Sequence, residues 1–566
     1  MKKRVKRLIA LLFAFIVPCS VFVCGGAAKA NDNKVIELNV YNAEEYISEY
    51  NSEWETFDII EAFEEEMKKE GLNVKVNYST FGTLENMYNE LQLTKKKGKD
   101  GYTYAYDLVC PSDYMIQRMI NEDMLERYDM NEDGTYAALG NYNDNASAFI
   151  QNLFNGKTEK DEVTGYVGKW SEYAACYMWG TMGFVYNPEV LAANTADGDI
   201  TEMVNSWSLP WNAYFKNLGT IKDSIRDTYA LAVGYTYREE LMQLLSLKAD
   251  GVLSQDEYQS ALIKVFNNVN TSLLDEFKEA GLTGEKLDAV YSLFKKYEGK
   301  NTVDSVGVNL KNLKSNVYGF EVDSGKKDMA AGKIAINFAW SGDAAYTLDL
   351  ADEDGTELFY EVPKEGSNIW FDAWVMPKGA NKALAQDFVN FLSSPEIAIS
   401  NMDYICYVSP IAGDDIFEYV RETYELILPE EYNALTEEEK AEYYEIDYSY
   451  YFGNISDEYK TDGKVIVYCT SDQVGRQLTT QYPEQSVIDR CALMTALSRS
   501  ELQALNAAWS DIKVGNVPVA LMIAIPVIIA LALIAFFVIK LLKKHGVNLR
   551  RKPRVYGKLI SSERVR

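Results

Sequence analysis

Residues 340–374 read WSGDAAYTLDLADEDGTELFYEVPKEGSNIWFDAW and concentrate tryptophans and carboxylates in one short stretch. An apolar run, IAINFAW, ends at Trp340, and a Ser-Gly pair then begins a helix-like segment. A second apolar run carries Trp370 and Asp372 at a spacing of two. Alternate residues of a strand share one face, so the pattern predicts an indole and a carboxylate that point the same way.

A Trp-x-Asp pair on one strand face suits an organic cation. The ring face attracts the positive charge, and the carboxylate accepts hydrogen bonds from an ammonium group. The other interpretation is that both tryptophans are core aromatics and that Asp372 caps a turn, because aromatic side chains are commonly buried.

Outward from this stretch, the chain alternates short apolar runs with segments of helical spacing. The predicted strands are 35–41, 73–78, 105–110, 181–188, 333–340 and 370–376. Ser112 follows the third strand and is expected to cap the helix after it. Strand and helix alternating at this spacing predict an α/β fold, in which helices cover a parallel sheet.

Two segments interrupt the alternation. Residues 237–300 are polar and amphipathic without strand patterns, which predicts an inserted helical pair. Residues 429–460 are rich in Glu and Tyr, which predicts a solvated excursion on the surface.

Both ends of the chain carry membrane-related patterns. Residues 1–30 combine basic residues, an apolar run and an Ala-Lys-Ala cleavage site, as is typical of a secretory signal peptide. Residues 517–539 are apolar and long enough to span a bilayer. The basic segment 540–566 follows and is expected to lie in the cytoplasm, which predicts a single-pass protein of the cell membrane with an extracytoplasmic domain.

Composition excludes several classes of function. The formal net charge is −28 although both ends are basic, so the exported part repels nucleic acid. The only histidine is His545, in the basic tail, so the exported domain cannot hold a Ser-His-Asp triad or a histidine-ligated metal. We expect no catalytic residues, no metal and no cofactor. The cysteines beyond the signal show no paired spacing and predict no disulfide framework.

The candidate ligand-binding residues lie at strand ends near turns, where open α/β sheets bind ligands. They are carboxylates, aromatics and hydroxyls from segments far apart in the chain: Glu44, Glu45, Tyr46, Ser112, Tyr114, Ser224, Asp227, Trp340, Trp370, Asp372 and Tyr407. This mixture describes a cation pocket better than a catalytic centre.

Short strings across most of residues 35–415, in order, resemble the spermidine/putrescine-binding proteins of bacterial ABC transporters. They include YNAEEY, YDLVCPSDYM, MAAGKIAINFAWSGDA and VPKEGSNIWFDAWVMP. The resemblance implies a type II periplasmic-binding-protein fold with two α/β lobes and a hinge. The lobes would comprise 31–145 with about 372–415, and about 146–371 with 416–512.

The resemblance also implies a function and a role for each residue. The protein would be a receptor, not an enzyme, that captures polyamines and delivers them to an ABC permease and its ATPase. Carboxylates at Asp372, Asp227 and Glu45 would pair with ammonium groups, and Trp340, Trp370 and Tyr46 would stack on methylenes. Ser112, Tyr114 and Tyr407 would close the ends.

Two departures from the family pattern are Ala43, where the family usually has Trp, and Ser224, where it has a carboxylate. They leave open a receptor for another small organic cation. A secreted hydrolase using Asp343 and Asp372 as acid and base is a further alternative. A tethered sensor of the same fold is the third.

Overall fold

The computed structural model describes residues 35–51, 56–98, 101–196, 198–514 and a few isolated positions from 527 to 540. The chain forms two units, Met1–Ala508 and Trp509–Arg566, and the fold below belongs to the first. The expected signal peptide lies outside the described residues, as does most of the expected span at 517–539. Within the residues described, no helix is both long enough and apolar enough to cross a bilayer.

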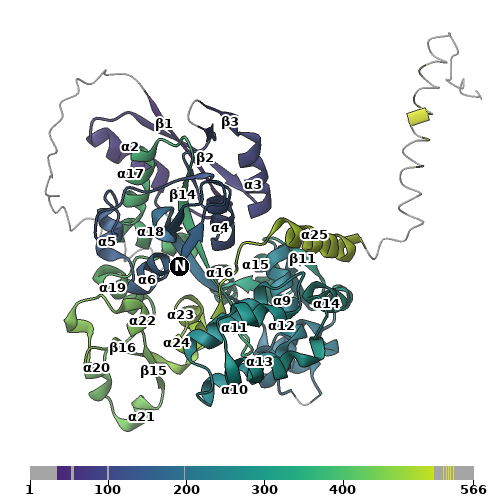
Figure 1. Ribbon diagram of the computed structural model, residues 1–566. Coiled ribbons are helices and arrows are strands. Elements are labelled where there is room, and N and C mark those ends of the chain that lie inside the picture. Colours follow the sequence, from purple (N-terminus) through teal and green to yellow (C-terminus); the bar gives the residue numbers. More distant parts are fainter. Residues whose placement is uncertain are drawn as a thin grey trace, which may run out of the picture. The chain divides into compact units, whose positions relative to one another are not determined.

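One mixed sheet, to which β1, β2 and β14 belong, organises the first unit (Figure 1). Its strand order is β11-β10-β12-β9-β14-β5-β1-β2. The bounds of these strands in chain order are β1 (Ile36–Ala43), β2 (Val74–Phe81), β5 (Leu108–Val109), β9 (Ala174–Tyr186), β10 (Gly219–Lys222), β11 (Gly319–Glu321), β12 (Ile336–Trp340) and β14 (Ser367–Pro377). Short strands at its margins are β6 (Leu125–Glu126), β13 (Phe359–Glu361) and β17 (Cys491–Ala492).

Two long antiparallel strands, β9 and β14, form the centre of this sheet. On one side β1 pairs in parallel with β2 and β5, and on the other β10 pairs in parallel with β11 and β12. Almost every residue of β9 and β14 is buried, which is typical of strands covered on both faces. The expected α/β fold is therefore confirmed, with parallel groups joined through an antiparallel centre.

Helices cover the parallel strands. α2 (Ile59–Lys69) is capped by the Asp58 side chain, which accepts from the backbone N–H of Glu61. α3 (Leu84–Leu93) follows β2, and α17 (Lys382–Leu392) follows β14. The other helices outside the two interrupting segments are α4 (Asp113–Asn121), α5 (Gly140–Asn145), α6 (Ala148–Gly156), α7 (Pro188–Asn194), α8 (Thr201–Val204), α9 (Ile225–Thr236), α14 (Thr302–Asn316), α15 (Gly325–Ala330), α16 (Ser341–Glu353), α18 (Pro395–Ile405), α19 (Asp414–Thr423), α23 (Gln477–Gln481), α24 (Gln485–Ile488) and α25 (Arg499–Val514).

The segment 237–300 contains more helices than the predicted pair. They are α10 (Arg238–Ala249), α11 (Gln255–Asn267), α12 (Leu273–Glu279) and α13 (Gly284–Phe294). Two of the three breaks fall at Gly251 and Gly281, which both adopt positive φ and so end helices easily. Leu244 and Phe294 are fully buried, so these helices pack as part of the compact unit (teal in Figure 1).

The segment 429–460 is a surface excursion only in its first part. α20 (Pro429–Asn433) and α21 (Glu437–Lys440) have no buried residue. β15 (Tyr443–Asp447) then pairs with β16 (Ile466–Thr470). α22 (Ser449–Phe452) is core, because Tyr451 is fully buried with its ring 5.3 Å from Trp179 of β9. The prediction of a solvated segment was wrong for this second part.

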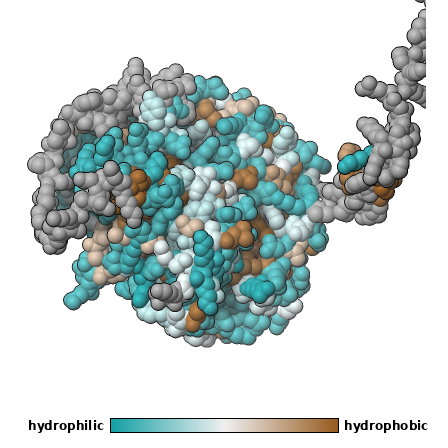
Figure 2. Space-filling model, turned by 90° about the horizontal axis from the view of Figure 1, so that it is seen from above, coloured by the Kyte–Doolittle hydropathy of each residue, from teal (hydrophilic) through white to brown (hydrophobic). Residues whose placement is uncertain are grey.

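The surface agrees with the composition. Figure 2 shows hydrophilic residues over most of the visible face, with separate small apolar patches. Each cysteine of the described part is buried: Cys110, Cys176, Cys406, Cys469 and Cys491.

Candidate functional site

Asp372 lies at an irregular point of β14, where its register with β9 shifts between Asp372 and Ala373. Such an irregularity re-aims neighbouring side chains. The Asp372 carboxylate accepts a hydrogen bond from the Tyr46 hydroxyl at 2.7 Å and from the Ser112 hydroxyl at 2.5 Å. The structure thus brings three predicted site residues together from the ends of β1, β5 and the middle of β14.

Ser112 holds the N-cap position of α4, but its hydroxyl makes no capping hydrogen bond. Ser112 is therefore the N-cap residue, as predicted, although its side chain does not supply the capping hydrogen bond. The hydroxyl is committed to Asp372, which offers a stronger, charged acceptor.

Asp227 in the first turn of α9 adds a second carboxylate close to the first. Burial, with a smaller contribution from the charge of Asp227, raises the pKa of Asp372 to about 6. Burial likewise raises the pKa of Asp227 to about 6, against the effect of a hydrogen bond from Ser224. Within the described residues neither carboxylate forms an ion pair, so this pair carries negative charge that a bound cation would neutralise.

Tyr114 lies beside a further carboxylate. Its hydroxyl is 3.4 Å from the Glu85 carboxylate, and the charge of Glu85 also contributes to the raised pKa of Asp227. The Arg226 guanidinium lies 4.6 Å from the centre of the Tyr114 ring and donates to the Thr495 carbonyl. Glu85 and Arg226 were not among the residues predicted from sequence.

Trp370 and Tyr407 form an aromatic wall between the strands. Their ring centres are 5.7 Å apart, and the Tyr407 ring is 5.0 Å from that of Tyr46. The Trp370 indole N–H donates to the carbonyl of Thr181 at 3.3 Å. Gly342 makes this wall possible, because a Cβ at that position would lie 2.2 Å from the Tyr407 ring.

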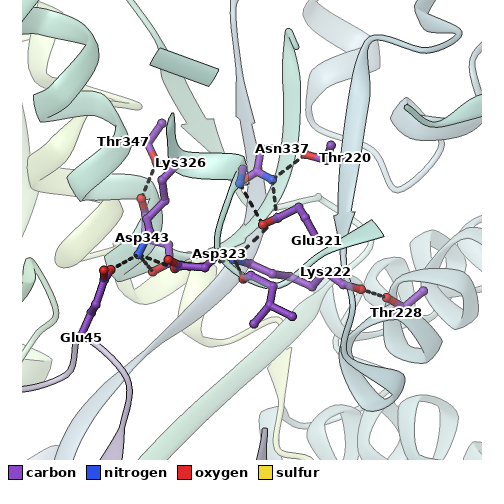
Figure 3. A network of polar contacts seen from close by, with 12 residues as sticks. Glu45, Thr220, Lys222, Thr228, Glu321, Asp323, Lys326, Asn337, Asp343 and Thr347 are labelled. Atoms are coloured by element: carbon purple, nitrogen blue, oxygen red, sulfur yellow. Dashed lines mark hydrogen bonds and ion pairs between the residues drawn. The ribbon is translucent and has the colours of Figure 1, made fainter. Parts of the chain in front are cut away.

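Tyr407 also contacts a network of ion pairs around Asp343, Lys222 and Lys326 (Figure 3). Asp343 accepts from the Tyr407 hydroxyl at 2.8 Å and from the Lys222 ammonium at 2.8 Å. The Lys326 ammonium is 3.5 Å from the same carboxylate. Although burial opposes ionisation, Lys222 and Lys326 lower the pKa of Asp343 to about 2.

Trp340 and the acidic loop after β1 contact these same lysines. The Lys222 ammonium lies 4.4 Å from the centre of the Trp340 ring, at cation–π distance. Glu45 is exposed, and its carboxylate is 3.5 Å from the Lys326 ammonium. Glu44 is exposed as well and is not brought into this cluster.

The geometry offers little to a carboxylate-pair hydrolase. Asp343 is held ionised by its lysines and cannot serve as a general acid near neutral pH. Among the described residues, no group of His, Cys, Asp and Glu side chains is arranged to hold a metal ion. A cavity of about 480 Å³ lies elsewhere, between α16 and α23, and none of the predicted residues lines it.

Known proteins similar to this chain bind solutes outside the cytoplasm. A family model described as bacterial extracellular solute-binding protein matches residues 58–413. The spermidine/putrescine-binding periplasmic protein of Salmonella typhimurium is 25% identical over 385 residues, which cover 68% of this chain and 80% of the relative. The putrescine-binding periplasmic protein of Pseudomonas aeruginosa is 27% identical over 408 residues, covering 72% and 84%.

Solved structures were also found. The spermidine/putrescine ABC transporter substrate-binding protein of Streptococcus pneumoniae aligns at 20% identity with a TM-score of 0.44, covering 84% of this chain and 98% of that one.

Proposed function

The chain belongs to the bacterial extracellular solute-binding protein family, and from that premise we propose that it captures polyamines for uptake by an ABC transporter. The names of its relatives, which bind spermidine and putrescine, support this ligand class. The observation that carries the proposal is the close pair Asp372 and Asp227, whose charges no described ion pair neutralises.

An ammonium group of the ligand binds between Asp372 and Asp227. Tyr46 and Ser112 already donate to Asp372 and fix the orientation of its carboxylate, so little ordering is needed on binding. A hydrogen bond to a charged group contributes roughly 1.5–3 kcal/mol, and a desolvated cation–π contact about 2 kcal/mol. A few such contacts reach micromolar affinity, about −8 kcal/mol.

The aromatic wall supports the methylene chain of the ligand. Trp370 and Tyr407 present ring surface beside Tyr46, and apolar CH₂ groups gain by leaving water against such rings. Tyr114 and Ser224 lie at the Asp227 end and close the site there. Trp340 already has the Lys222 ammonium on its ring and contributes less to the ligand than its sequence pattern suggests.

Binding moves two lobes, in this proposal. The first lobe comprises residues 31–145 with about 372–415. The second lobe comprises about 146–371 with 416–512. β9 and β14 run through the centre of the sheet and link the parallel strands on its two sides, where a hinge would act. Closure around the ligand gives the permease and its ATPase a form to recognise, and the segment 517–539 keeps the receptor at the membrane.

Titration calorimetry on the purified protein tests the proposal. We expect saturable binding of putrescine or spermidine, no binding of a neutral amino acid, and loss of binding in Asp372→Asn. Asp457→Asn is the matched control, because the Asp457 side chain is fully exposed. Absence of binding to both polyamines would contradict the proposal and favour a different small organic cation.

A further inference from the structure

Lys222 is a buried cation inside an acidic and aromatic cluster. It ends β10 with a side chain that is 1% exposed. Its ammonium contacts the Asp343 carboxylate at 2.8 Å, the Val322 carbonyl at 3.0 Å and the Trp340 ring at 4.4 Å. A carboxylate, a carbonyl oxygen and an indole face are also the groups that bind the ammonium group of a ligand. The Lys222 side chain therefore occupies a position, between Asp343 and Trp340, that would otherwise suit a ligand ammonium.

The position of the Lys222 ammonium is connected to the proposed ligand site through a chain of side-chain contacts. Asp343 accepts from Tyr407, whose ring contacts those of Tyr46 and Trp370, and Tyr46 donates to Asp372. A cation at Asp343 and a cation at Asp372 would therefore be neighbours, bridged by two tyrosines. A long polyamine could reach both positions only if Lys222 were absent.

Four carboxyl groups without a described ion pair interact electrostatically here: Asp372, Asp227, Glu85 and Asp113. Burial, with a smaller contribution from the charge of Asp372, raises the pKa of Asp113 well above its usual range, so three charged carboxylates remain for a ligand. Arg226 supplies one positive charge nearby, but its guanidinium donates to Asn267 and Thr495. The remaining negative charge matches two ammonium groups rather than three.

We propose that Lys222 determines specificity by acting as a tethered substitute for a ligand ammonium between Trp340 and Asp343. The site then accepts the two ammonium groups of a short diamine and excludes the third ammonium of a triamine. This inference rests on the proposed function and names the ligand class within it.

Calorimetry of the purified full chain with putrescine and spermidine tests the proposal. The wild type is expected to bind putrescine more tightly than spermidine. Lys222→Met keeps most of the length of the side chain and removes its charge. Trp340 then loses the cation on its ring, and Asp343 keeps only Lys326 as a described ion-pair partner. We expect the affinity for spermidine relative to putrescine to rise about tenfold or more, as one added charged contact allows.

Lys326→Met is the matched comparison, because Lys326 shares Asp343 but lies over Tyr346 rather than Trp340. It leaves Lys222 in place, so the spermidine-to-putrescine ratio should change by less than about threefold. In the double variant Lys222→Met/Asp343→Asn most of the gain of Lys222→Met should be lost again, because the carboxylate in direct contact with the Lys222 ammonium is removed. Glu321, the next carboxylate, is 3.8 Å from that ammonium and already accepts from Asn337 and from the backbone N–H of Gly325.

The outcomes separate this inference from the proposed function. An unchanged ratio in a folded Lys222→Met would overturn the inference while leaving polyamine capture intact. A wild type that binds spermidine about tenfold more tightly than putrescine would overturn it without any variant. If neither the wild type nor Lys222→Met binds any amine, polyamine capture itself fails, and the inference fails with it.

Discussion

The negative charges of Asp372 and Asp227 lower the stability of the folded chain, because both carboxylates are buried. The pKa of each rises to about 6 in the fold, above the ordinary value near 4 of an unfolded chain. A raised pKa contributes stability that is fully present below the unfolded value and lost as pH rises through the folded one. At neutral pH these two ionised carboxylates therefore destabilise the fold, which is a common feature of functional sites.

Asp372→Asn should raise the melting temperature of the ligand-free protein at about pH 7. Removing the buried charge contributes on the order of 1–2 kcal/mol, reduced by the weaker hydrogen bonds that Tyr46 and Ser112 then make. Thermal unfolding at about pH 4 should show a smaller difference, because the wild-type carboxyl is by then largely protonated. A lower melting temperature at neutral pH would contradict this.

The pKa of Asp343 shifts in the opposite direction from those of Asp372 and Asp227, so its charge stabilises the fold. Its pKa is lowered to about 2, so its contribution is present above the unfolded value and is lost only as pH falls through the folded one. Asp343→Asn leaves Lys222 and Lys326 without their shared partner and should destabilise the fold at neutral pH by about 3–5 kcal/mol.

For individual residues, the sequence predicted carboxylates, aromatics and hydroxyls of the candidate site but not the side chains that they contact. Tyr46, Ser112 and Asp372 follow or interrupt predicted strands, and they meet in one set of hydrogen bonds. Lys222 ends the short strand GTIK and reads like any surface lysine. Only the three-dimensional approach of β10 to α16 shows that its ammonium is buried on Trp340.

Helices and strands were predicted correctly where hydrophobic residues recur at a regular spacing. The prediction failed where it relied on the average composition of a segment. The alternation of strand and helix from β1 to α4 follows the predicted order, apart from the short hairpin of β3 (Lys96–Lys97) and β4 (Tyr102–Thr103) before β5. In residues 429–460 the abundance of glutamate hid a local pattern. Tyr448, Tyr451 and Phe452 lie three and four residues apart, on one helix face, and all are fully buried.

Tyr451→Ala should destabilise the protein by about 3–5 kcal/mol, the usual cost of removing a large buried aromatic ring. The ring packs against Trp179 and Tyr482, and its hydroxyl donates to the Ser409 carbonyl. Tyr444→Ala, in the exposed part of β15, should cost less than about 1 kcal/mol. Urea unfolding measures both, and equal effects would contradict a core role for α22.

The whole molecule extends beyond the part that defines its family. The family model ends at residue 413, yet β17 pairs with β14 and Tyr482 is buried, so the segment to Ala508 completes the same compact unit. The short sequence strings within residues 35–415 allowed the family to be recognised from the sequence. The match of the family model to residues 58–413 confirms membership of the extracellular solute-binding proteins. The packing of the later segment could not be predicted, since it depends on contacts with strands distant in sequence.

The compact unit ends at Ala508, before the predicted membrane span, so the two can be separated experimentally. A chain that stops after Val514 lacks the apolar run 517–539 and its basic flank, the two features that predict anchoring. We expect the full chain in the membrane fraction of cells and the shortened chain in the soluble exported fraction, with polyamine binding retained. A chain that lacks only 546–566 is the control and should stay with the membrane, because the span and its first lysines remain. Membrane retention of the chain ending at Val514 would contradict the predicted anchor and place the attachment within the folded unit.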